Sequence, residues 1–155
     1  MDPRRGNAGT WFAGRALTMS HVAAHQPFAY ALSVPVPLQA QVWDCFNRGQ
    51  VLSAAFEAHE AAMNAGFMPD EATSLSLTLA ELCVQAVTNA HGAIATLFFT
   101  DAGWRLEVAD SGPGSDRSHA PVIHAELPRP LTSLRALSAG KCTVVIAQYE
   151  REENG

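Results

Sequence analysis

Apolar residues recur with the spacing of an α-helix in two adjacent stretches of the chain. In residues 50–65 they return about every three to four positions, which predicts an amphipathic helix. We expect this helix to end before Gly66, because glycine readily adopts the left-handed conformation found after helices. A second helix is predicted to open at Pro69-Asp70-Glu71 and to run to about Ala90. Asp70 is suited to cap it, and acidic residues stabilise the first turn of a helix.

The rest of the chain alternates between short apolar runs and turn-forming residues. Residues 93–100 and 104–109 are two runs that predict strands, and the turn residues 101–103 between them predict a hairpin. Residues 143–149 predict another strand. Residues 111–130 hold four prolines and two glycines, which favours a loop.

Three further segments carry weaker patterns. Residues 28–36 alternate in part and contain proline, which is typical of an edge strand. The apolar side chains of residues 38–48 allow a short helical turn. Residues 131–137 fit either a strand or a short helix with its leucines inside, and we favour the strand.

The predicted order of elements is strand, helix, helix, hairpin, loop and strand. This order indicates an α/β (α+β) fold, a two-layer sandwich in which an antiparallel or mixed sheet carries helices on one face. With 155 residues the chain is long enough for one domain, which we place at residues 27–150. Residues 1–26 are expected to form a flexible tail. Fraying is expected from Glu150, with residues 151–155 as a frayed tail.

Composition narrows the classes of function. The net charge of −5 and the pI of about 5.6 argue against nucleic acid as a partner. The odd number of cysteines, three, indicates reduced thiols and a cytoplasmic protein. No apolar run reaches the roughly 18–20 residues that span a bilayer, so a membrane is not an expected partner.

Two stretches together suggest a binding site. The second predicted helix contains Glu81, Gln85 and Asn89, and the strand after the hairpin runs into the sequence Asp110-Ser-Gly112-Pro-Gly114. By itself, a helical glutamate is usually a surface residue, and the Asp-Ser-Gly-Pro-Gly stretch is an ordinary turn. Their combination, one hairpin apart, favours a nucleotide-type site. A carboxylate at the edge of such a site can accept a proton from a hydroxyl group.

This combination resembles the GHKL superfamily, whose ATP-binding core has the GHKL (Bergerat) type of two-layer fold. The bacterial anti-sigma factors and switch-type serine kinases are the most similar members. The resemblance covers residues 50–114 and continues more weakly to residue 149. It implies that Glu81 acts as the catalytic base of an ATP-dependent protein serine/threonine kinase. It further implies that Asp110 binds the adenine amino group of the nucleotide.

The same resemblance assigns the remaining site residues. Gly112 and Gly114 match the glycines that let the backbone approach the nucleotide. Gln85 stands where these proteins carry the asparagine that holds Mg²⁺, and Asn89 is the substitute one turn later. Proline occurs in residues 128–130, where a glycine box would bind phosphate, and proline has no N–H group to donate.

These departures suggest a weakened nucleotide site with degenerate metal- and phosphate-binding boxes. We therefore expect a regulatory protein of a partner-switching system that controls transcription, with ATP and Mg²⁺ as cofactors. The alternative is a catalytically inactive protein-binding module, a pseudokinase that keeps the fold without ATP. The resemblance implies a sigma factor or an anti-sigma-factor antagonist as the partner, and formation of a homodimer.

Overall fold

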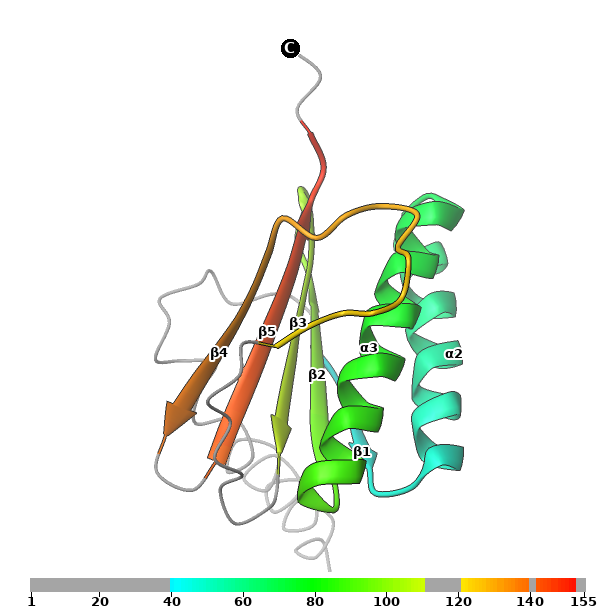
Figure 1. Ribbon diagram of the computed structural model, residues 1–155. Coiled ribbons are helices and arrows are strands. Elements are labelled where there is room, and N and C mark those ends of the chain that lie inside the picture. The colour runs from blue at the N-terminus through cyan, green and yellow to red at the C-terminus, as the bar shows by residue number, and fades with distance from the viewer. Residues whose placement is uncertain (1–39, 111–120, 140–141, 153–155) are drawn as a thin grey trace, which may run out of the picture. The chain divides into compact units, whose positions relative to one another are not determined.

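The computed structural model describes residues 40–110, 121–139 and 142–152 (Figure 1). The elements follow in the order β1 (Ala40–Cys45), α2 (Arg48–Asn64), α3 (Pro69–Ala90), β2 (Ala93–Phe99), β3 (Gly103–Asp110), β4 (Ser133–Ala139) and β5 (Cys142–Glu150). The strands form one antiparallel sheet in the order β1-β2-β3-β5-β4. Both helices lie on one face of this sheet (Figure 1). The predicted α+β fold with helices on one face is therefore confirmed, whereas the predicted tail 1–26 and strand 28–36 lie outside the described residues.

Helix α2 begins and ends as its sequence predicts. The side chain of Asn47 caps it by accepting the N–H of Gln50 at 2.9 Å. At the other end Gly66 has a φ of 86°, and the Phe67 N–H donates to the Ala62 carbonyl at 3.0 Å. This pair of features is the turn that commonly terminates helices, and it confirms the expected role of Gly66.

Helix α3 begins at Pro69, where the predicted helix opens, but it is capped differently. Its cap residue is Met68, whose N–H donates to the Glu71 carboxylate at 2.6 Å, and Pro69 occupies the first helical position. The prediction that Asp70 caps this helix is wrong, because Glu71 supplies the acceptor from inside the first turn. Pro69 loses nothing there, since the first N–H groups of a helix have no partner within the helix.

The core lies between the helical layer and the sheet. Its largest fully buried side chains come from α3, β2 and β3: Leu75, Leu79, Leu97 and Leu106, with Trp104 almost fully buried. Burial of one such leucine side chain contributes on the order of 2 kcal/mol. The helices approach closely because α2 turns small residues toward the core, namely Ala54, Ala55, Ala58 and Ala62.

Two ambiguous segments are both strands. Residues 38–48 contain β1, so the predicted helical turn is wrong. Trp43 pairs with Ala95 of β2, and Val42 faces the opposite side of the sheet with 43% of its surface exposed. Residues 40–45 are extended because their backbone forms hydrogen bonds with β2, and the sequence pattern of residues 38–48 does not reveal that pairing. Residues 133–139 form β4 beside β5, which confirms the strand over the helix.

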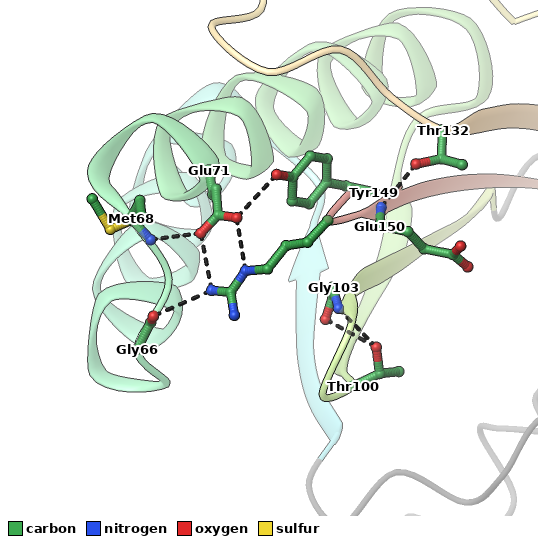
Figure 2. A network of polar contacts seen from close by, with 9 residues as sticks. Gly66, Met68, Glu71, Thr100, Gly103, Thr132, Tyr149 and Glu150 are labelled. Atoms are coloured by element: carbon green, nitrogen blue, oxygen red, sulfur yellow. Dashed lines mark hydrogen bonds and ion pairs between the residues drawn. The ribbon is translucent and has the colours of Figure 1, made fainter. Parts of the chain in front are cut away.

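The start of α3 is tied to the end of β5 by a network around the buried Glu71 (Figure 2). The Glu71 carboxylate accepts the Tyr149 hydroxyl at 2.9 Å and two guanidinium N–H groups of Arg151 at 2.8 and 3.0 Å. The Arg151 hydrogen bond is the main reason that the pKa of Glu71 falls to about 2. The Arg151 guanidinium also lies 4.5 Å from the centre of the Phe67 ring. Fraying therefore does not start at Glu150, which belongs to β5, and Arg151 is anchored.

Candidate functional site

Residues 121–131 precede β4 in the chain and run alongside α3 before they reach the sheet (Figure 1). They contain no helix or strand. In Figure 1 this yellow-to-orange segment follows one side of α3 before it crosses to the sheet. We call residues 121–131 the strap.

Polar side chains of α3 hold the strap by its main chain. The two oxygens of Glu81 accept the N–H groups of His124 and Ala125, at 2.5 and 2.9 Å. The amide of Gln85 donates to the Val122 carbonyl at 2.9 Å. The Glu81 carboxylate thus binds two consecutive backbone amides, an arrangement typical of charge-assisted hydrogen bonds.

A further bond lies more than a turn farther toward the start of α3. There the Ser74 hydroxyl accepts the N–H of Arg129 at 2.7 Å. Ser74 is fully buried. Because the strap residues rise in number while the helix residues fall, the strap runs antiparallel to α3.

The spacing of these side chains explains why they act together. Ser74, Thr78, Glu81 and Gln85 follow one another at intervals of four, three and four residues. Residues at such intervals share one side of a helix. Thr78 is also fully buried, and its hydroxyl donates to the Ser74 carbonyl at 2.7 Å. The result is a stripe of four polar residues along one side of α3.

The prolines of the strap select which of its amides can bond. Pro128 and Pro130 have no N–H, so within residues 128–130 only Arg129 can donate from the main chain. That amide is the one bound by Ser74. The prolines in the expected phosphate-binding position are therefore part of a segment fastened to α3.

The predicted site residues fall into separate places. Glu81 and Gln85 lie together under the strap. Asn89 is exposed on the last turn of α3. Gly112 and Gly114 lie outside the described residues.

Asp110 lies at the end of β3 and is 4% exposed. It is paired with Ala93, a fully buried residue of the core, so its side chain is on the sheet face toward the helices. Its Oδ1 accepts the Thr143 N–H of β5 at 3.2 Å. Because β2 starts just after α3 ends, Asp110 is level with the C-terminal end of α3, and Glu81 is roughly 13 Å back along the helix axis, at about 1.5 Å a residue.

Asp110 is a buried carboxylate at a strand end, the kind of acceptor that an exocyclic amine needs. Both oxygens of Glu81 accept strap amides, and the amide nitrogen of Gln85 donates to a strap carbonyl. While the strap is bound, these two side chains therefore position a chain segment.

Sequence reasoning missed Ser74 and the main-chain groups of the strap. One signal was available, because the polar residues at positions 74, 78, 81 and 85 interrupt an apolar helix at regular intervals. Their partners are backbone groups up to 55 residues away, and no side-chain pattern marks such partners.

A second surface feature lies elsewhere. A shallow hollow of about 410 Å³ lies at the junction of β1 and α2, lined by Trp43, Gln50 and Glu57 among others. The Trp43 indole N–H donates to the Glu57 carboxylate at 2.8 Å across it. No predicted site residue of the described chain lines this hollow.

No family model matches the chain, and no curated protein matches its sequence. Among the described residues, no cluster of three or more His, Cys, Asp and Glu side chains could hold a metal ion. The helices described are too short or too polar to cross a membrane.

Proposed function

We propose that this protein is a regulatory protein-binding module of a partner-switching system, with a GHKL-type fold whose nucleotide site is closed by the strap. The observation that carries the proposal is the Glu81 carboxylate, both oxygens of which accept strap amides. A residue used in this way positions a chain segment instead of a reacting hydroxyl. The partner, by the resemblance of residues 50–114, is a sigma factor or an anti-sigma-factor antagonist.

A second candidate is an ATP-dependent serine/threonine kinase. The position of Asp110 favours it, since this buried carboxylate lies at the end of a strand on the face toward α3. Under this alternative the strap leaves α3 when the nucleotide binds, and Glu81 becomes available as the base. Gln85 or Asn89 would then hold Mg²⁺, and Gly112 and Gly114 would contact the nucleotide.

Calorimetric titration of the full chain with ATP and Mg²⁺ separates the two candidates. The proposed module gives no binding heat at millimolar nucleotide. Micromolar binding that is lost in Asp110→Asn would overturn the proposal in favour of the kinase.

A strap variant makes the same experiment more specific. Glu81→Ala removes the acceptor of two strap amides, so it loosens the strap at His124 and Ala125 while leaving Asp110 in place. If the site is only closed, this variant binds ATP and the wild type does not. If the site is lost, neither binds. If the wild type transfers labelled phosphate from ATP to a candidate antagonist protein, the result supports the kinase candidate and contradicts the binding-module candidate.

A further inference from the structure

The outer surface of the helical layer carries an apolar band. Its members are large hydrophobic side chains that face away from the sheet. They are Leu52, Phe56 and Met63 of α2, with 69%, 63% and 40% of their surface exposed, and Leu77 and Val84 of α3, each 36% exposed. We call these five residues the outer band. Single exposed hydrophobic residues are ordinary, but a contiguous set marks an interaction surface.

The spacing of the outer band makes it continuous. On α2 its residues are four and seven positions apart, and on α3 they are seven apart, so each set forms one stripe. The two helices touch where the Ser76 hydroxyl donates to the Ala55 carbonyl at 2.8 Å. Leu77 follows Ser76, and Phe56 follows Ala55. The two stripes therefore lie on neighbouring helices near this contact, and an exposed apolar surface of this kind accepts the apolar side of a third helix.

The charges around the outer band specify the partner. Helix α3 contains no lysine or arginine, and the sole lysine or arginine of α2 is Arg48 at its start. Glu60 is four positions after Phe56, and Asp70 is seven before Leu77, so two exposed carboxylates border the band. A second copy of the chain would bring the same carboxylates to this border, which like-charge repulsion disfavours. A partner with basic flanks satisfies them.

We propose that the outer band docks an amphipathic helix of a partner protein, whose apolar stripe packs against the outer band and whose lysine or arginine residues face Glu60 and Asp70. The inference rests on the proposed function in that it assigns a surface to the protein-binding role. It uses neither the strap contacts nor Asp110. On α3, Leu77 and Val84 lie beside Glu81, four residues before it and three after it, while Asp110 belongs to the sheet.

Two designed helical peptides test the proposal with the full chain. Both carry the same leucine stripe, one flanked by lysine and the other by glutamate, and each is labelled for fluorescence anisotropy. We expect micromolar binding of the lysine-flanked peptide and binding of the glutamate-flanked peptide at least about ten-fold weaker. The double variant Leu52→Ser/Phe56→Ser should weaken binding of the lysine-flanked peptide at least about ten-fold. Leu137→Ser, which removes a similarly exposed side chain on β4, is the matched control and should bind as the wild type does.

Circular dichroism of each variant shows whether it is folded, so that a loss of peptide binding can be distinguished from a loss of folding. The proposal is overturned if the two peptides bind equally well, if neither binds, or if Leu137→Ser weakens binding as much as the double variant. A wild-type dimer in sedimentation equilibrium that the double variant converts to monomer would also overturn it, since the occupant would be a second copy. The ATP titration tests the proposed function separately. Nucleotide binding would refute that function, but it would leave the proposal of the docking surface standing.

Discussion

Glu71 and Arg151 are 80 residues apart in the sequence and form an ion pair whose carboxylate is buried between the start of α3 and the end of β5. If the Glu71 carboxylate is removed, the Arg151 guanidinium and the Tyr149 hydroxyl both lose their hydrogen-bond acceptor. We expect Glu71→Ala to lower the free energy of unfolding by about 3 kcal/mol. Urea unfolding followed by far-UV circular dichroism measures this change. Glu60→Ala, an exposed carboxylate on α2, should change stability by less than about 0.5 kcal/mol, and a similar loss in both variants would contradict the prediction.

The same carboxylate makes stability depend on pH. The pKa of Glu71 is lowered from 4.5 to about 2, first by the Arg151 hydrogen bond, against the opposing effect of burial. Because the unfolded chain binds the proton more tightly, the stabilisation is fully present above pH 4.5 and is lost as the pH falls through about 2. Unfolding free energies measured across this range should fall more steeply in the wild type than in Glu71→Gln. Parallel curves for the two proteins would refute the assignment.

Glu81 should protect specific amides from exchange with solvent. Hydrogen bonds to a charged acceptor contribute about 1.5–3 kcal/mol, so Glu81→Ala should speed exchange of the His124 and Ala125 amides at least about ten-fold. Hydrogen exchange followed by NMR resolves these positions. Ser74→Ala is the matched variant, because it should expose the Arg129 amide and leave His124 protected. Unchanged exchange in Glu81→Ala would show that the strap is held by other contacts.

Gly103 should tolerate no side chain. A Cβ placed there would lie 1.8 Å from the Tyr149 carbonyl oxygen and 2.9 Å from the Glu150 Cα, both of them backbone atoms of β5. We expect Gly103→Ala to lose about 3 kcal/mol or more, because adjacent strands must separate. Gly49→Ala is the control. Its added Cβ meets only the Asn47 side chain, at 3.3 Å, and alanine favours helix, so no more than about 1 kcal/mol should change in thermal or urea unfolding.

Elements with a strong local period could be predicted, and those fixed by distant partners could not. The 22 residues of α3 repeat their apolar pattern, and the turn before Gly103 lies between two apolar runs, so both elements were predictable. Strand β1 was not, because its conformation depends on β2, which begins 48 residues after Cys45. The capping of α3 by Glu71 was also missed. Asp70 and Glu71 are adjacent acidic residues, and only the geometry of the turn distinguishes them.

The candidate site follows the same rule. Positions of Glu81, Gln85 and Asp110 on a helix and at a strand end were predictable from the pattern. The partners of Glu81 were not, since they are main-chain amides 43 and 44 residues away that carry no side-chain signature.

In the described chain, the hydrogen bonds from α3 to the strap all end on main-chain atoms, at Val122, His124, Ala125 and Arg129. These polar contacts therefore depend on the N–H groups of His124, Ala125 and Arg129 and not on the side chains of those three residues, whereas Ile123 and Leu131 of the strap pack against the core. Substitutions at His124 or Ala125 can accumulate without displacing the strap, provided that the N–H remains. A proline at either position would break the contact.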